Sequence, residues 1–261
     1  MLVTVTVNLR KVRARRSVRS RFGAAVETLI DEVHLFASRL EAAGLTVDSP
    51  LAAIELSAAI RVRSDPARGP QIAALTRSLA AAARRGALEW GPMVVEPEWS
   101  HARVDGAFHR SYRVAGWPQL PVSSDWLSVL LTGTQAVRTV TVVLEPVPMS
   151  RAATADREDM SREAEADMKT QKGFRVNARE RKRLGDVEAR ERELSEGHAE
   201  FQFVGIVTVT ATDLDKLDDA CADVEQAAAQ SLLDLRPLDA RHELGWLACL
   251  PLGRALTRRI Q

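Results

Sequence analysis

The sequence predicts an α+β fold, and three observations point to it. Apolar runs rich in β-branched residues, such as 137–147 and 201–209, are typical of strands. Other stretches carry apolar residues at every third or fourth position, which is typical of amphipathic helices. In the second half of the chain the two patterns alternate, as expected for a sheet with helices packed against it.

The first part of the chain, residues 1–99, is expected to be a mainly helical companion that begins with a strand. Aliphatic residues alternate with Thr and Asn at the start, which predicts that strand. Apolar residues then recur at helical spacing, and Gly44 follows as a C-terminal cap. Asp48-Ser49-Pro50 is typical of a helix start. The expected elements are a strand at 2–9 and helices at 17–43, 48–63 and 70–85.

Residues 100–254 are expected to form the sheet domain. Asp105-Gly106 lies between two short strand-like runs and predicts a β-hairpin. Thr212-Asp213 precedes an amphipathic run with acidic residues in its first turn, where the helix dipole favours them. The expected strands are 109–116, 137–147, 200–211 and 233–238, and the expected helices are 123–132, 212–231 and a short segment ending at Leu250-Pro251-Leu252-Gly253.

A charged segment interrupts this order. Between 151 and 196 nearly every second residue is charged, with balanced signs and few large apolar residues. Opposite charges often lie three or four residues apart, which favours solvated helices. We expect a long charged helical hairpin inserted at about 150–198 that breaks near Gly173; a disordered linker is the alternative. Without it, the order is β-α-β-β-α-β, which predicts a ferredoxin-like core.

Composition excludes several classes of function. The chain has 36 Lys and Arg against 35 Asp and Glu, so no strong overall field favours nucleic acid. Cys221 and Cys249 both occupy apolar helical positions, as reduced core thiols do. The sequence has no signal peptide pattern and no run of about twenty apolar residues that would cross a membrane.

Motifs for catalysis or cofactor binding are absent from the sequence. A phosphate-binding loop ends in Gly-Lys-Ser/Thr, yet none of the five lysines follows a glycine. The five histidines are scattered, and no pair has the spacing that places two metal ligands on one helix face. His101 and His109 could face each other across the hairpin, but no cysteine is near them. We therefore expect no catalytic residues, no cofactor and no metal.

A basic segment near the N-terminus is the best candidate for electrostatic binding. It has no acidic residue before Glu27. It could contact anionic lipid at the cytoplasmic face of the membrane, or DNA phosphates, although it lacks the interleaved aromatic residues of single-strand binders. A solvated loop and helix start is an equally good interpretation. The candidate residues are Arg10, Lys11, Arg13, Arg15 and Arg16.

Several segments carry a resemblance to a known family. "VDGAFH" at 104–109, with "YRVAGWP" at 112–118, is similar to a stretch of actinobacterial proteins. The run "RELSEGH" at 192–198 and the ending "ELGWLACLPLG" at 243–253 are similar to others in the same proteins. Together they resemble the N-terminal, non-motor domain of the large conjugative ATPases of type IV secretion, the TraC/TrbE-like family. The match to 1–99 is looser and rests mainly on "AGLTV" at 43–47.

The resemblance implies a non-catalytic assembly domain that acts in DNA transfer through protein contacts at the cytoplasmic membrane face. Implied partners are a motor domain, following the tail at 255–261 or on a separate subunit, and components of the secretion channel. A homo-oligomer is also implied as an option. We expect an exposed apolar patch at Trp246, Leu250 and Leu252. A nucleic-acid-binding sheet and an enzyme of unrecognised type are the alternatives, the latter less favoured because no nucleophile–base pair is evident.

Overall fold

The structure is a computed structural model that describes residues 3–5, 20–77, 91–119, 121–147 and 201–253. The chain divides into two compact units: residues 1–141 with 205–261, and residues 142–204. In the second unit, the described residues are the end of one strand and the start of another. The expected helical hairpin at 150–198 and the tail at 255–261 lie outside the described residues.

Three helices precede the sheet. α1 (Arg21–Ala42) begins at Ser20, whose Oγ accepts a hydrogen bond from the Gly23 N–H at 3.0 Å. α2 (Ala53–Ser64) begins later than the sequence predicts, because the Glu55 carboxylate accepts from the Ala52 N–H at 2.7 Å and so fixes the first turn there. A 3₁₀ turn, η1 (Pro66–Arg68), leads into α3 (Gly69–Arg77).

The predicted strand at 2–9 is not found where the structure can test it. Residues 3–5 belong to no strand, and the other residues of that segment lie outside the described part. The predicted helix at 70–85 is described only as far as Arg77, the last residue of α3.

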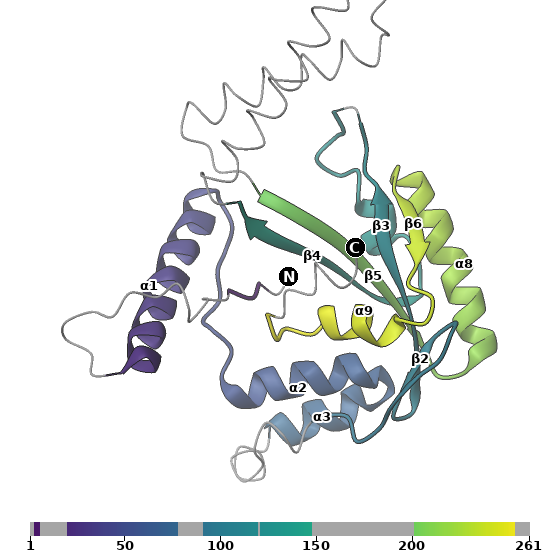
Figure 1. Cartoon of the computed structure of the whole chain (residues 1–261), viewed down its shortest axis with the longest axis horizontal. Coiled ribbons are helices and arrows are strands. Elements are labelled where there is room, and N and C mark those ends of the chain that lie inside the picture. The colour runs from purple at the N-terminus through teal and green to yellow at the C-terminus, as the bar shows by residue number, and fades with distance from the viewer. Residues whose placement is uncertain (1–2, 6–19, 78–90, 120, 148–200, 254–261) are drawn as a thin grey trace, which may run out of the picture. The chain divides into compact units, whose positions relative to one another are not determined.

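A six-stranded antiparallel sheet forms the centre of the fold (Figure 1). Its order is β1-β2-β3-β5-β4, and β6 also pairs with β3. β2 pairs with the first residues of β3 and β6 with its last residues, both on the side away from β5. The strands are β1 (Val95–Pro97), β2 (Ala102–Val104), β3 (Ala107–Gly116), β4 (Val137–Pro146), β5 (Phe201–Ala211) and β6 (Asp234–Pro237).

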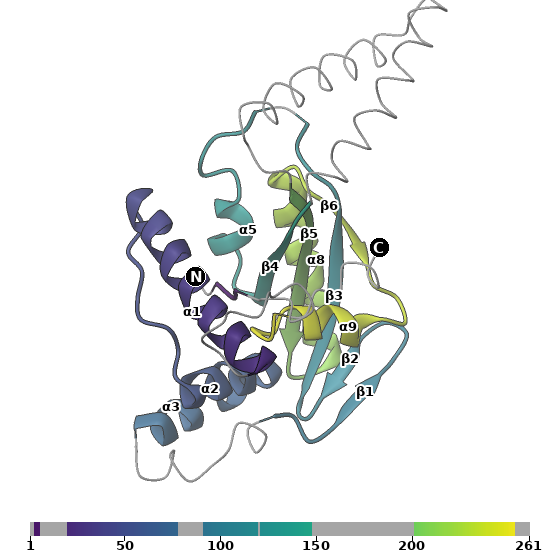
Figure 2. The same cartoon turned by 60° about the vertical axis from the view of Figure 1, so that its left-hand side comes forward.

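Helices cover both faces of the sheet. α8 (Leu214–Gln230) and the short α5 (Ser128–Thr132) enclose the main apolar core with alternate residues of β3 and β5. α9 (His242–Ala248) lies on the other face, and Figure 2 shows α8 and α9 on opposite sides of the strands. The buried core members include Tyr112, Val114, Leu130, Val207, Val209, Leu217, Val224 and Leu233.

Most expected elements of the second half are present. The Asp105-Gly106 hairpin is confirmed by the pairing of Val104 with Ala107, and Asp105 takes a positive φ of 51°. β4 and β5 are neighbours in one sheet, as the strand order predicted. α5 is shorter than the predicted 123–132 because the residues before Ser128 form turns. β1 lies near the short strand that the sequence predicts at 93–95, and it extends the sheet into the region before residue 100.

Candidate functional site

The face of the sheet under α9 carries polar residues that are almost entirely buried. Side chains alternate along a strand, so every second residue of β3 and of β5 points to this face. His109 lies opposite Thr210, and Ser111 lies opposite Thr208. All four are at most 8% exposed. This buried polar face is the largest concentration of chemistry-bearing side chains in the described core, and is therefore the first candidate site.

His109 connects three segments of the fold. Its Nε2 lies 3.0 Å from the Ser64 carbonyl at the end of α2, and its Nδ1 lies 2.9 Å from Thr210 Oγ1 on β5. Because a carbonyl can only accept, Nε2 donates to Ser64 and Nδ1 accepts from the Thr210 hydroxyl. Burial lowers the pKa of His109 to about 4, against smaller opposing effects of the Ser64 carbonyl and Asp65. The imidazole is therefore neutral at pH 7.

His242 fills the gap between β2 and β6 on the edge of β3. Its Nδ1 accepts a hydrogen bond from the Ser111 N–H at 3.1 Å. Neither β2 nor β6 pairs with β3 at Ser111, so no strand supplies this acceptor. Its Nε2 makes no hydrogen bond of normal geometry, and Asp239 Oδ1 lies 3.9 Å away. Burial lowers the pKa of His242, although Asp239 and the nearby Ser111 and Trp99 backbones act in the opposite direction. The first helical residue of α9 thus replaces a strand in the hydrogen bonding of β3.

A chain of hydroxyl and thiol groups continues from His242 across the sheet. Ser111 Oγ donates to the His242 carbonyl at 3.0 Å, so it must accept from Thr208 Oγ1, which lies 2.9 Å away. Thr208 Oγ1 in turn lies 3.3 Å from Cys249 Sγ, whose thiol is left as the donor. Burial raises the pKa of Cys249, which keeps it a thiol. The hydrogen bonds of Ser111 and Thr208 are therefore used within the fold.

Asp105 fastens the β2–β3 hairpin to the N-terminal region. One carboxylate oxygen accepts from the Met93 and Val94 N–H groups at 2.9 and 3.0 Å, and the other pairs with the Arg61 guanidinium of α2. Burial alone would raise the pKa of Asp105, but the Arg61 hydrogen bond and the two backbone donors hold it below its ordinary value. Both side chains of the pair are about nine-tenths buried.

This arrangement locks the fold together and offers no reacting group. A nucleophile needs a base with a free lone pair within hydrogen-bond reach and access to a substrate. Here His109 and His242 are buried, and the acceptor nitrogen of each is already occupied by Thr210 or Ser111. Within the part of the chain that the structure describes, no group of three or more His, Cys, Asp or Glu side chains is placed to hold a metal ion.

The pairing of His101 with His109 considered from the sequence does not occur. The His101 ring packs against Phe108, with ring centroids 5.5 Å apart. His109 points to the opposite face, where its ring lies 6.1 Å from that of Trp246. Adjacent strand residues such as Phe108 and His109 face opposite sides of a sheet, and this separates the two histidines.

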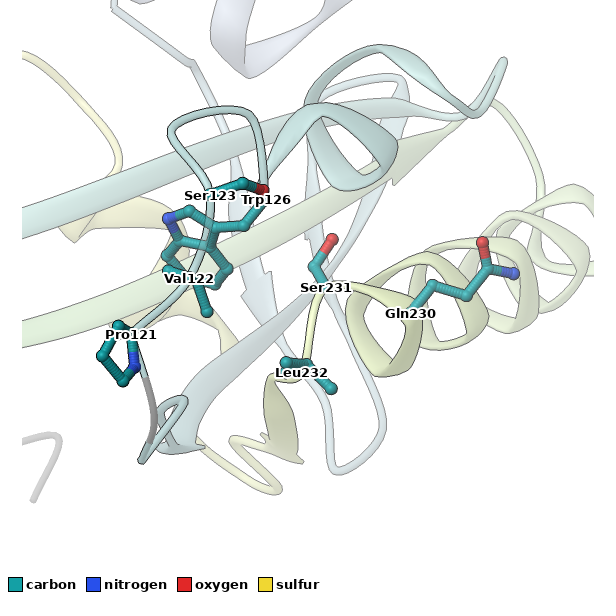
Figure 3. Close-up of a pocket in the computed structure, with 7 residues that line it drawn as sticks. All are labelled: Pro121, Val122, Ser123, Trp126, Gln230, Ser231 and Leu232. Carbon is teal, nitrogen blue, oxygen red and sulfur yellow. The ribbon is translucent and has the colours of Figure 1, made fainter.

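A shallow pocket at the C-terminal end of α8 is the second candidate (Figure 3). It has a volume of about 320 Å³, and no charged side chain lines it. The hydroxyl of Ser231, one of its lining residues, is buried without a hydrogen-bond partner in the described structure. Trp126 packs edge to face with Trp117 at 6.5 Å. The lining residues are Pro121, Val122, Ser123, Trp126, Gln230, Ser231 and Leu232.

The apolar patch predicted at the end of the chain is wrong for two of its three residues. Trp246 and Leu250 are each only 6% exposed, in a cluster with Val104 that Ile60 and Leu247 complete. Leu252 is 41% exposed. The reason is that α9 folds back over the hairpin and α2. The basic candidates Arg10, Lys11, Arg13, Arg15 and Arg16 lie outside the described residues.

The buried polar face was missed by sequence reasoning. Its partners are far apart in the chain: 45 residues separate His109 from Ser64, and 131 separate Ser111 from His242. A local signal exists only in β5, where Thr208 and Thr210 alternate with apolar residues in a strand that is buried on both faces. Threonines in such a strand need partners from the covering helix.

Comparison with known proteins adds no family assignment. No protein-family model matches this sequence, and no curated protein matches it. Among the helices of the described segments, none is both long enough and apolar enough to cross a lipid bilayer.

Proposed function

We propose that this chain is a non-catalytic assembly domain of a conjugative, type IV secretion ATPase. The observation that carries the proposal is that the two segments with the clearest resemblance to that family pack on each other. Val104, which opens "VDGAFH", shares a buried cluster with Trp246 and Leu250 of "ELGWLACLPLG". Next to these segments in the sequence, His242 accepts a hydrogen bond from the backbone N–H of Ser111. Segments about 130 residues apart thus form one structural unit.

We also propose that the core is ferredoxin-like. Its elements follow the order β3-α5-β4-β5-α8-β6, which is the β-α-β-β-α-β motif. In space, β6 and β5 flank β3, and β4 lies beyond β5. That arrangement supports the assignment, because the motif places its first and third strands at the centre. β1 and β2 are additions at one end of β3, and the charged hairpin would replace the turn between β4 and β5.

A scaffold role agrees with how the polar groups are used. Polar side chains that an enzyme would present to a substrate here connect elements of the fold. His109 and Asp105 bind α2, and Ser111 binds α9. The segment after α9 is then a joint, where Pro251 and Gly253 keep the chain from continuing as a helix and redirect it toward a motor domain or subunit. Gly253 has a positive φ of 59°, which suits such a turn.

No observation favours the nucleic-acid-binding alternative. RNA-recognition sheets stack bases on aromatic side chains of an open face. The equivalent face here presents His109, Ser111 and Thr208, which are buried beneath α9. Phe201 and Phe203 are half exposed, but they belong to the first residues of β5. Tyr112, the other aromatic residue considered from the sequence, lies in the core under α8.

The site of action within the proposal is the cytoplasmic face of the membrane, with channel components as partners. The basic residues from Arg10 to Arg16 support this by charge alone, because anionic lipid attracts such segments by about 1 kcal/mol per charge. No lysine in the sequence follows a glycine, which supports a division of labour in which another domain supplies the phosphate-binding loop.

The test is a direct measurement of ATP binding and hydrolysis. Titrate the purified chain with ATP and Mg²⁺ in a calorimeter and assay phosphate release, with a known phosphate-binding-loop ATPase as the positive control. The proposal expects neither binding heat nor turnover from this chain. Binding with a dissociation constant on the order of micromolar, or turnover above background, would contradict the proposal and support the alternative that the chain is an enzyme.

A further inference from the structure

Helix α1 carries an apolar stripe with the spacing of a coiled coil. Its members are separated by four, three, four, three and four residues, so they alternate between the d and a positions of a heptad. The repeat runs through most of the helix without interruption. This stripe, called here the α1 seam, consists of Phe22, Val26, Leu29, Val33, Phe36 and Leu40.

The α1 seam lacks an extensive packing partner among the described helices and strands. Phe22 is 72% exposed, and Val26 and Phe36 are each 40% exposed. In contrast, Ala24 and Ala25 in the first turn are already buried. The other seam members, Leu29, Val33 and Leu40, are half-buried, so the seam is partly exposed along its length. Large apolar side chains exposed along a helix mark an interaction surface. Ala24 and Ala25 lie beside the seam and not on it, so buried residues flank the first turn although Phe22 itself is exposed.

The residues that flank the α1 seam match a second copy of the same helix. If two copies run antiparallel with Val33 opposite Phe36, then Leu29 falls opposite Leu40. The same register brings Glu32 of each copy to Arg39 of the other, so the ion pair forms twice. On the opposite flank, Ile30 of each copy lies beside Ala37 of the other, so two apolar side chains face each other there.

Other arrangements of two α1 helices fit less well. In a parallel pair, Glu32 faces Ala37 and Arg39 faces Gly44, so neither charge finds an opposite partner. An antiparallel pair with full overlap sets Glu32 against its own copy, and like charges in that position repel. That pair would also need the first turn, where Ala24 and Ala25 are already buried.

We propose that α1 forms an antiparallel two-helix coiled coil with a second copy of this chain, centred between His34 and Leu35. The interface has four apolar layers, formed by Leu29 with Leu40 and Val33 with Phe36, each twice. Two Glu32–Arg39 pairs close one side and set the orientation. The proposal rests on α1 alone and stands whether or not the chain is a secretion-ATPase domain.

The experiment is sedimentation velocity of the full chain across a concentration series. The wild-type chain is expected to dimerise with a dissociation constant on the order of micromolar. The single variants E32R and R39E should each weaken the dimer by about tenfold, because two ion pairs become two repulsions. Mixing them in equal amounts should restore dimers, since one chain then carries two arginines on that flank and the other two glutamates. A parallel dimer would show no such rescue.

Two apolar variants provide the matched control. F36S alters two of the four layers and should leave the chain monomeric, whereas L35S should dimerise like the wild type. Leu35 is 47% exposed on the same helix but lies off the seam. Circular dichroism confirms that each variant is folded. A monomeric wild type at roughly 100 µM would overturn the proposal, as would equal effects of F36S and L35S or a failed rescue in the mixture.

Discussion

His109 makes the stability of this fold depend on pH. Its pKa is lowered from 6.5 to about 4 by burial, so below pH 6.5 the unfolded chain binds a proton that the folded chain does not. Folding stability attributable to His109 is therefore complete above 6.5 and falls as pH drops toward the folded pKa. From about pH 7 to about pH 5 the loss is about 2 kcal/mol. His242, whose pKa is also lowered, adds to it in the same direction.

The measurement is urea unfolding at both pH values, for the wild type and for His109→Gln. The glutamine variant is less stable at neutral pH, because Ser64 and Thr210 lose part of their hydrogen bonding. Glutamine also has no group that takes up a proton in this pH range, so the stability of the variant changes less between the two pH values. Equal pH dependence in both proteins would show that His109 is not the buried neutral histidine described.

The Asp105–Arg61 pair is expected to contribute strongly to the stability of the fold. Asp105→Ala leaves the Arg61 charge buried without its partner and the Met93 and Val94 N–H groups without an acceptor. The expected cost is about 3–5 kcal/mol in the free energy of unfolding. Asp105→Asn should cost less, because the amide oxygen still accepts and Asn tolerates the positive φ. A change below about 1 kcal/mol for the alanine variant would mean that the pair is effectively solvated.

At the scale of elements, α9 is held on the sheet by the absence of a side chain at Gly245. A Cβ there would lie 2.3 Å from Ser111 Cβ and 2.8 Å from Leu238 Cδ1. Gly245→Ala should therefore destabilise the fold by about 3 kcal/mol through overpacking. Gly69→Ala is the control for overpacking, because the nearest atom to a Cβ at that position is 3.9 Å away. If thermal unfolding shows equal stability for the two variants, α9 is not seated as described.

Local sequence patterns predicted where the helices and strands lie better than they predicted which of these elements contact each other. Asp105-Gly106 gave the hairpin correctly, because its turn chemistry is contained in two residues. The start of α2 was misplaced, since Asp48-Ser49-Pro50 resembles a helix start but the Glu55 carboxylate fixes the first turn at Ala52. Trp246 and Leu250 were expected at the surface, because no local pattern reveals that α9 folds over the hairpin and α2.

At the scale of the whole molecule, the two faces of the sheet are stabilised differently. The face under α8 is an apolar core. Its members, such as Val207 and Leu217, can be identified in the sequence from the spacing of apolar residues in strands and helices. The α9 face depends on hydrogen bonds between residues far apart in the chain, such as Ser111 with His242. Only a three-dimensional arrangement identifies those partners. The candidate site was therefore less predictable than the fold around it.

The assembly role is tested most directly by proximity labelling in the cells that encode this chain. Fuse a labelling enzyme to the chain, identify the labelled neighbours by mass spectrometry, and use the same labelling enzyme unfused in the same cells as the control. The proposal predicts that membrane-embedded secretion-channel components and a phosphate-binding-loop ATPase are enriched over the control. Enrichment of nucleic-acid-binding or metabolic proteins in place of these components would contradict it.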